Sequence, residues 1–313
     1  MKRSTTFAAK LLLLTLAIAI ADRSIGSLLR HYYYRSTHGD QSRLTYVMDS
    51  VTDPVLVLGA SRALRQYDSR VIADSLQMAC YNTGKDKQSI LYCLAVLKAA
   101  LLRYHPKCVL LDLQAISFST LQYSLDGLSD LLPYYHQHPE IRPIVDQRSP
   151  FEWLKTQSFL YCYNSLLLPI AFDNITHSKD TGIYNGYNPK HGGLRRPPFQ
   201  PYTLQAISNP SDSSLVAAFR EILDLTLENG GRIAVIVSPL YYALPGDPAT
   251  FQLAKKICAE RNVLFLDYTN EAGFIQNKDL FIDELHMNNI GSDLFTRKLC
   301  SDLVARGFRN QRE

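Results

Sequence analysis

The sequence has six cysteines but no pattern that would bind a metal ion. No two of them form a Cys-x-x-Cys pair, and their spacing matches no zinc site. Most lie in apolar surroundings, which is typical of buried small side chains, although an exported domain would allow some of them to pair. We therefore predict no metal site. The cysteines are Cys80, Cys93, Cys108, Cys162, Cys258 and Cys300.

The sequence also lacks a strong excess of charge of either sign. Its 33 lysines and arginines against 29 aspartates and glutamates leave a formal net charge of +4, and the basic residues are scattered. This balance is too mild to indicate nucleic-acid binding. Internal repeats and low-complexity tracts are absent as well, which excludes a repeat architecture. With 313 residues, 46% of them hydrophobic, the chain is long enough for one large domain or two small ones.

The N-terminus has the features of a targeting segment. Three basic residues among the first ten precede the apolar stretch 11–21, as in a signal peptide. Residues 19–21 offer a small-x-small cleavage site, but apolar residues continue to Leu29, so a retained anchor is an equally open interpretation. A buried amphipathic helix of a soluble protein is the alternative. We predict export to the periplasm or another extracytoplasmic compartment, with residues 1–35 as a cleaved signal or an inner-membrane anchor.

Beyond residue 50, apolar strands alternate with helical stretches. Continuous apolar strands separated by helices indicate a parallel sheet that is covered on both faces. Right-handed connections then give a three-layer α/β/α sandwich, here with a mostly parallel five-stranded sheet of flavodoxin-like type. The predicted strands are 55–58, 78–81, 108–113, 232–237 and 263–267. The predicted helices lie around 71–76 and at 89–104, 215–227, 248–259 and 290–305.

Two parts of the chain depart from this alternation. Residues 36–43 are polar, and we predict a linker there. Residues 120–210 hold many aromatic residues and prolines but no clear strand, so we interpret them as a helical insertion. Neither edge of this insertion resembles a flexible linker. We therefore predict a single α/β domain over residues 36–313.

Two short segments far apart in the chain carry candidate catalytic residues. The predicted strand 55–58 runs into a glycine turn that presents Ser61. Near the other end, Asp283 stands three residues before His286, just ahead of the last predicted helix. A serine needs a base to become a nucleophile, and a histidine needs an orienting partner to act as that base. Each residue alone is more simply a turn, a cap or a surface side chain, but their joint occurrence favours a site.

These segments resemble the SGNH (GDSL-like) hydrolase superfamily. The matching blocks are Leu-Gly-Ala-Ser-Arg at 58–62, Tyr-Asn-Thr-Gly at 81–84 and Asp-Glu-Leu-His at 283–286. The likeness is closest to the cell-envelope branch, which contains DltD-like and alginate-acetylation-like proteins. The resemblance implies that Ser61 is the nucleophile, that His286 is its general base, and that Asp283 orients the imidazole.

The resemblance also points to an oxyanion hole, which needs hydrogen-bond donors where negative charge develops. The candidates are a backbone N–H at Ser61 or Arg62, the backbone of Gly84, and the side chain of Asn82. The family's third block normally reads Gly-x-Asn-Asp. Here residues 112–115 read Asp-Leu-Gln-Ala, without an asparagine. This departure is compatible with weak or absent hydrolase activity.

Other patterns compete with this interpretation. Residues 59–62 resemble the glycine loop of short-chain dehydrogenases, but the later glycines are missing, and we reject that reading. The His-x-His at 136–138 lies beside a proline and is more typical of an unliganded loop. The basic and aromatic segment 186–196 is either a grip for an anionic or sugar-like substrate or a solvated loop. The substrate-contact candidates are Tyr187, Arg195, Arg196 and Tyr241.

The sequence therefore predicts an enzyme that acts on ester bonds. We expect a serine esterase or O-acyltransferase that uses a Ser-His-Asp triad on acyl esters of a cell-envelope glycan. The ester chemistry follows from the triad, whereas the glycan follows only from the resemblance and the export signal. No metal or organic cofactor is implied; the expected partners are an acylated glycan or small ester, and the membrane if the N-terminal helix is retained. The alternative is a non-catalytic envelope protein that binds a glycan or an assembly partner in the same cleft.

Overall fold

A five-stranded parallel sheet forms the centre of the fold. The computed structural model describes residues 2–175, 184–194 and 198–310, with side chains from residue 6 onward. The strands run in the order β2-β1-β3-β4-β5, and every neighbouring pair is parallel. The predicted α/β class with a flavodoxin-like parallel sheet is confirmed, and each predicted strand lies within two residues of an observed one. The strands are β1 (Val55–Leu58), β2 (Cys80–Asn82), β3 (Cys108–Asp112), β4 (Arg232–Val237) and β5 (Leu264–Asp267).

Helices of very different length surround and precede the sheet. The long ones agree with the apolar periodicity of the sequence, and most of the short ones lie between residues 121 and 208, where a helical insertion was predicted. Short 3-10 turns lie at 128–134, 139–141, 146–148, 161–166 and 278–280. The α-helices are α1 (Lys2–Arg35), α2 (Gly39–Asp49), α3 (Ser61–Gln66), α4 (Ser69–Leu76), α5 (Ile90–Leu101), α6 (Leu121–Gly127), α7 (Arg142–Val145), α8 (Glu152–Lys155), α9 (Leu167–Ile175), α10 (Leu204–Ser208), α11 (Ser213–Glu228), α12 (Ala249–Glu260) and α13 (Asn289–Ala305).

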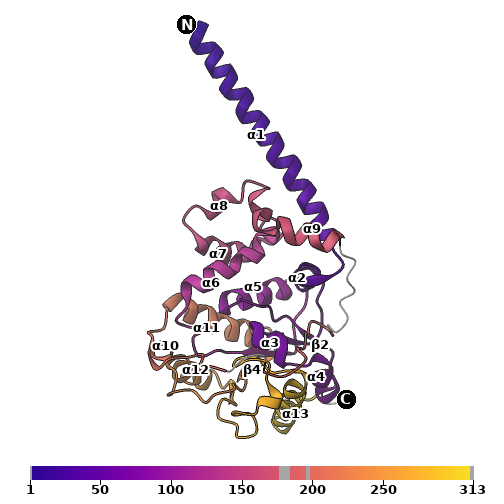
Figure 1. Ribbon diagram of the computed structural model, residues 1–313, viewed down its shortest axis with the longest axis vertical. Helices are drawn as coiled ribbons and strands as arrows, with labels where there is room; N and C mark the ends of the chain where they lie inside the picture. The colour runs from indigo at the N-terminus through magenta and orange to yellow at the C-terminus, as the bar shows by residue number, and fades with distance from the viewer. Residues whose placement is uncertain (1, 176–183, 195–197, 311–313) are drawn as a thin grey trace. The chain divides into compact units, whose positions relative to one another are not determined.

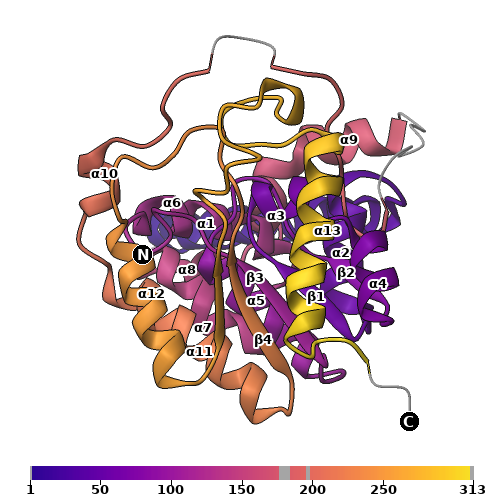
Figure 2. The same cartoon turned by 90° about the horizontal axis from the view of Figure 1, so that it is seen from below.

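Helices cover both faces of the sheet. α5 and α11 pack together on one face, and α13 packs with α3 and α4 on the other (Figure 1). Figure 2 shows α13 crossing in front of the parallel strands. Alternate residues of each strand point to opposite faces, so Val55 and Val57 pack toward α13 while Leu56 and Leu58 point the other way. All four are fully buried, which explains why this strand is apolar throughout.

The chain divides into two compact units. Unit 1 contains residues 1–45 and 129–180, and unit 2 contains residues 46–128 and 181–313. Every strand lies in unit 2. The middle of the predicted insertion therefore groups with the N-terminal helix in unit 1, while its two ends belong to the sheet unit.

The predicted linker at 36–43 is wrong in its second half. α2 begins at Gly39 and runs to Asp49. Leu44, Val47 and Met48 are buried, and their spacing of three and four residues places them on one face of the helix. The polar Gln41 is buried with them, and the other polar residues of the helix are partly or fully exposed. The low number of apolar residues is why the sequence looks like a linker.

Most apolar residues of the N-terminal helix α1 are exposed. Residues 6–21 are all exposed, and Leu12, Leu13 and Ile18 are each more than 60% exposed. A helix that is apolar on all sides fits a membrane and not the surface of a soluble domain. The segment Thr6–Arg35 is long and apolar enough to be a signal anchor or a membrane span. The alternative of a buried amphipathic helix is wrong, because the apolar stretch is not buried.

Candidate active site

Ser61 is the first residue of α3, three residues after Leu58, the last residue of β1. Gly59 makes the turn with a φ of +155°, a backbone conformation that favours glycine. A Cβ at Gly59 would lie 2.5 Å from the Cβ of Ala63 and 3.1 Å from that of Asp112. The glycine thus lets α3 start directly above the strand. As predicted, the serine lies beyond the carboxyl end of a parallel strand, where sites in such sheets form.

Asp283 and His286 share a tight turn ahead of α13. The Asp283 carboxylate accepts the backbone N–H of Leu285 at 2.9 Å and that of His286 at 2.8 Å. The turn is closed by a bridge between Phe281 and Met287, and by the N–H of Ile282, which donates to the carbonyl of His286 at 3.0 Å. The side chain of Asp283 therefore organises the backbone that carries His286.

The N-terminal cap of α13 anchors the same turn. Asn288 caps the helix, since its side-chain oxygen accepts the N–H groups of Ile290 and Gly291. Its side-chain nitrogen donates to the carbonyls of Asp279 and Gly192. A Cβ at Gly291 would lie 2.2 Å from the carbonyl oxygen of Leu280, so a glycine is required for this close approach.

The three predicted catalytic side chains lie in one hydrogen-bonded row. Nε2 of His286 is 2.8 Å from Oγ of Ser61. Nδ1 of His286 is 2.9 Å and 3.0 Å from the two carboxylate oxygens of Asp283. The side chains of His286 and Asp283 are 22% and 28% exposed, so the row can be reached from solvent. These distances meet the geometric requirement for a nucleophile, its base and the group that orients the base.

The charge on Asp283 sets the proton positions in this row. Burial raises the pKa of Asp283, but the hydrogen bond and charge of His286 together with the two backbone N–H groups outweigh it, and the pKa lies below its ordinary value. An ionised carboxylate only accepts hydrogen bonds, so Nδ1 of His286 must carry a proton. In the neutral imidazole Nε2 is then free to accept the hydrogen of the Ser61 hydroxyl.

The lowered pKa of Asp283 predicts a pH-dependent stability difference. A carboxyl group with a depressed folded pKa stabilises the fold fully above its unfolded value of about 4, and this contribution is lost as the pH falls through the folded value. We expect the unfolding free energy of the wild type to exceed that of Asp283→Asn near neutral pH, and the gap to shrink below about pH 4. Urea unfolding of both proteins at several pH values measures this difference in unfolding free energy. A difference that does not change with pH would contradict the lowered pKa of Asp283.

A polar network holds the two distant segments together. The side chain of Gln66, the last residue of α3, donates to the carbonyl of Leu285 at 2.9 Å, next to His286. The hydroxyl of Thr296 on α13 accepts the N–H of Asp68 at 3.1 Å and lies 3.0 Å from the carbonyl of Gln66. Through these bonds the segment that carries Ser61 is joined directly to the segment that carries His286.

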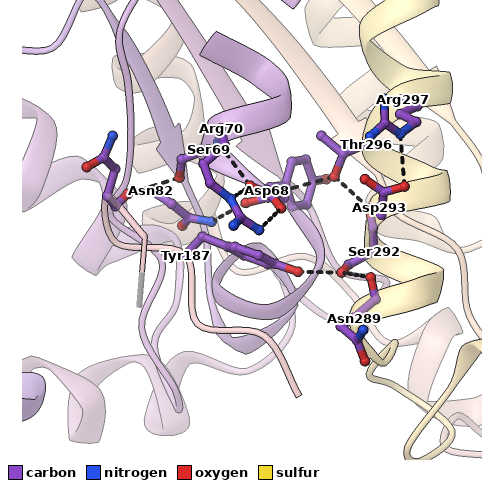
Figure 3. A network of polar contacts seen from close by, with 12 residues as sticks. Asp68, Ser69, Arg70, Asn82, Tyr187, Asn289, Ser292, Asp293, Thr296 and Arg297 are labelled. Carbon is purple, nitrogen blue, oxygen red and sulfur yellow. Dashed lines mark hydrogen bonds and ion pairs between the residues drawn. The ribbon is translucent and has the colours of Figure 1, made fainter. Parts of the chain in front are cut away.

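Figure 3 shows the wider network around this junction. Asp68 caps α4 and pairs with Arg70 at 2.7 Å, while the hydroxyls of Tyr187 and Ser292 bond to each other. Ser69 donates to the carbonyl of Asn185 at 2.9 Å. The network thus joins α4, the segment 184–187 and α13.

Gln66 is therefore expected to act as a positioning residue. Replacing it with methionine keeps most of the volume but leaves the carbonyl of Leu285 without this donor, which frees the turn that carries His286. For the ester hydrolysis that the sequence predicts, the loss of one buried hydrogen bond is expected to lower kcat about tenfold with a nearly unchanged KM. A purely structural role would instead lower the melting temperature while kcat per folded molecule stays at the wild-type value.

The predicted oxyanion donors have different surroundings. Both amide hydrogens of the Asn82 side chain are used, by the carbonyls of Ala63 at 2.7 Å and Tyr67 at 2.9 Å. The backbone N–H of Gly84 donates to the side-chain oxygen of Asn82 at 2.9 Å. The structure therefore gives these two groups a role in holding α3 against β2. The N–H groups of Ser61 and Arg62 lie in the first turn of α3, where no acceptor exists within the helix.

The side chain of Arg62 belongs to a buried ion pair that sequence reasoning missed. Its guanidinium lies 3.3 Å from both oxygens of Asp112 and donates to the carbonyl of Leu113 at 2.8 Å. Tyr67 and Ser238 also donate to Asp112, at 2.7 and 2.8 Å. Burial lowers the pKa of Arg62, but the charge of Asp112 outweighs it, so the pKa is raised. The sequence feature that could have indicated this pair is Asp112 itself, an acidic residue at the end of an apolar strand.

A small cavity lies where the strand order reverses. β1 and β3 are neighbours whose connections leave in opposite directions, and the crevice at such a switch point is the usual ligand site in open parallel sheets. The cavity has a volume of about 30 Å³, enough for roughly two water-sized groups. Its lining includes Gly59 and Ala60, directly before Ser61, together with Asp112 and Gln114 at the end of β3.

The predicted substrate contacts are only partly placed. Tyr187 is 1% exposed and bonds to Ser292, so the prediction that it contacts substrate is not supported. Tyr241 is also buried; its N–H donates to the carbonyl of Glu284 at 3.2 Å, and it supports the turn that holds His286. Arg195 and Arg196 lie outside the described residues.

Within the described parts of the chain, no three histidine, cysteine or acidic side chains gather as metal ligands would. His136 contacts the carbonyl of Thr156, and His138 contacts Glu140 at 2.7 Å. All six cysteines are free and buried. Burial raises the pKa of Cys93 and Cys108 to about 12, which makes these thiols poor nucleophiles.

Comparison with known proteins gives only a distant structural likeness. No known protein family and no curated protein matches the sequence. Among solved structures, the chain is similar to a "putative acylhydrolase" from Bacteroides fragilis, with a TM-score of 0.42 and 9% sequence identity. The match covers 86% of this chain and 98% of that one. A likeness this distant carries no argument about activity, so the function is argued from the site itself.

Proposed function

We propose that the protein is an SGNH-like serine esterase or O-acyltransferase that uses Ser61, His286 and Asp283 as its triad. One observation carries the proposal: the contact of 2.8 Å between Oγ of Ser61 and Nε2 of His286, with Asp283 on the other ring nitrogen. Residues that are 225 positions apart in the chain would not form this row through local folding alone.

The chemistry follows from the proton positions. His286 takes the proton of Ser61 as its oxygen attacks the ester carbonyl, and it then gives that proton to the leaving alcohol as the C–O bond breaks. The acyl group is left on Ser61. Water completes a hydrolysis, or a hydroxyl of an acceptor completes a transfer. His286 removes the proton of the attacking group and returns it to Ser61 as the bond between Ser61 and the acyl group breaks. Asp283 stays ionised and stabilises the imidazolium in both halves.

The surroundings of Ser61 support a small acyl group. The backbone N–H groups of Ser61 and Arg62 are the proposed oxyanion donors, since they lie at the start of α3 beside the nucleophile. The cavity of about 30 Å³ beside Gly59 and Ala60, directly before Ser61 in the chain, has room for a small group such as an acetyl. The proposed substrate is therefore a short-chain acyl ester.

The proposed setting is the cell envelope. The exposed apolar surface of α1 supports a membrane anchor, and the anchor supports export of the catalytic unit to the periplasm or another extracytoplasmic space. An acylated envelope glycan as substrate rests on this setting and on the SGNH resemblance. The intact mass of the protein isolated from purified membranes distinguishes a retained anchor from cleavage after Ala21.

A fluorophosphonate probe tests the catalytic proposal. Such a probe forms a covalent bond with an activated serine hydroxyl, so we expect stoichiometric labelling of the wild type and no labelling of Ser61→Ala. Ser89→Ala serves as the matched control, because Ser89 lines the cavity beside Gly59 and Ala60 but has no histidine partner among the described residues. Labelling that persists in Ser61→Ala would refute the assignment of the nucleophile.

One observation favours the non-catalytic alternative. The side chain of Asn82 and the N–H of Gly84 are used to hold α3, which leaves the oxyanion hole to backbone groups of α3. If the folded wild type takes up no probe but binds acylated glycan fragments, the protein is a binding component of the envelope and not an enzyme.

A further inference from the structure

Unit 1 presents an exposed apolar cluster around α8. Phe151, Trp153 and Leu154 are 63%, 55% and 53% exposed, and they follow one another almost without interruption. Large apolar side chains gathered on a surface in this way usually mark a contact with a partner or a membrane. We refer to these three residues as the 151–154 cluster.

The cluster is held firmly from inside the unit. Glu152, between its members, is 1% exposed and pairs with Arg148 and with Lys155, the latter at 3.2 Å. The hydroxyl of Tyr161 donates to the same carboxylate at 2.7 Å. Because Glu152 is fixed on the inner side of the short helix, its neighbours are held toward solvent.

The cluster lies close to the point where α1 first contacts the rest of unit 1. The side chain of Arg23 donates to the carbonyl of Gln157 at 3.0 Å. Asp22 accepts the N–H groups of Phe159 and Leu160 at 3.0 and 3.1 Å. Residues 6–21 of α1 are exposed throughout, so this contact marks the end of the free apolar part of the helix.

The length of that free part places the contact at a bilayer surface. From Phe7 to Ala21 the helix is about 22 Å long at 1.5 Å per residue, and the one charge within it, Lys10, has a side chain long enough to reach the headgroups. The hydrocarbon core of a bilayer is about 30 Å thick. A helix this short pulls whatever is attached at Asp22 against the membrane.

We infer that the 151–154 cluster inserts into the interfacial layer of the bilayer that α1 crosses. The inference rests on the proposed anchor. Tryptophan favours the headgroup level, where its ring is partly apolar and its N–H can meet water or lipid oxygens. Lys155, with 43% of its side chain exposed, lies beside the cluster and can meet lipid phosphates.

A second apolar surface in the same unit provides a contrast. On α9, Leu168, Phe172 and Ile175 are at least 65% exposed. The side chain of Asn174 donates to the carbonyl of Tyr32 at 3.1 Å. Tyr32 is ten residues beyond Asp22, or about 15 Å further along α1, so this surface is expected to lie away from the bilayer.

Depth-dependent fluorescence quenching tests the inference in the full chain. Trp153 is the only tryptophan, so its emission reports on the cluster without labelling. The protein is reconstituted in vesicles of phosphatidylethanolamine and phosphatidylglycerol with acyl chains brominated near the headgroup. We expect roughly twofold or stronger quenching of Trp153 relative to unbrominated vesicles. The matched control combines Trp153→Phe with Phe172→Trp, which moves the tryptophan to α9 and is expected to abolish the quenching.

Alkaline carbonate extraction reports on α1 separately. Retention of the chain in the membrane without quenching of Trp153, or equal quenching at positions 153 and 172, would overturn the inference and leave the anchor standing. Extraction of the chain by carbonate would refute the anchor and the inference together. Neither outcome bears on the labelling of Ser61, which tests the catalytic proposal.

Discussion

Replacing His286 with alanine is expected to lower kcat for an aryl acetate ester by about 10⁴- to 10⁶-fold. Without the imidazole nothing removes the proton of Ser61, and a neutral serine hydroxyl is a poor nucleophile. The residual rate comes from substrate binding and oxyanion stabilisation alone. Stopped-flow or steady-state hydrolysis assays measure the effect, and circular dichroism checks that the variant is folded.

The partners of His286 sharpen this prediction. Asp283→Asn should lower kcat about 10⁴-fold, because the amide no longer holds the imidazole in the tautomer that accepts the proton of Ser61. The double variant His286→Ala with Asp283→Asn should be no slower than His286→Ala, since the groups act as one unit. His105→Ala is the matched control, because His105 is exposed and far from this turn in the sequence. Losses that simply multiply, or a loss below tenfold in His286→Ala, would refute the triad.

The second large effect concerns the stability of the sheet unit. Asp112→Ala is expected to destabilise the protein by about 3–5 kcal/mol, because it leaves the guanidinium of Arg62 buried without its counter-charge. Both side chains are essentially inaccessible, at 1% and 0% exposure, so water cannot replace the lost partner. Tyr67 and Ser238 lose their acceptor at the same time.

Urea unfolding of the full chain measures this effect. Arg220→Ala is the matched control, because the pair of Arg220 and Glu260 is about 40% exposed and such surface pairs contribute less than about 1 kcal/mol. A midpoint for Asp112→Ala close to that of the control would show that the buried pair does not stabilise the fold. The same variant is also expected to lose fluorophosphonate labelling, because Arg62 follows Ser61 directly in α3.

The strands and the long helices were predictable because their signals are local. β1 and β4 were placed at their observed ends, since each is a continuous apolar run bounded by glycine or proline. α2 was missed because its buried face holds only three apolar residues, Leu44, Val47 and Met48, together with the polar Gln41. So few apolar residues in a polar stretch resemble a linker until the surface that covers them is known.

The roles of single polar residues were less predictable. Tyr187 and Asn82 were assigned to substrate and to the oxyanion, yet the structure uses both for internal hydrogen bonds. Gln66 gave no functional signal in the sequence, although it supports the His286 turn. Asp112, which balances a buried arginine, was marked only by its place at the end of an apolar strand. A polar side chain reveals its role only through its partners, and these come from distant parts of the chain.

The sequence alone was enough to predict the apolar N-terminal helix and the parallel α/β architecture. It also identified a serine, a histidine and an aspartate as candidate catalytic residues. Each depends on periodicity or on neighbours within a few positions. The alignment of Ser61 with His286, the pairing of Arg62 with Asp112, and the grouping of residues 129–180 with the N-terminal helix were decided only when the chain folded. Contacts between residues fifty or more positions apart depend on how the layers pack, and no local pattern records them.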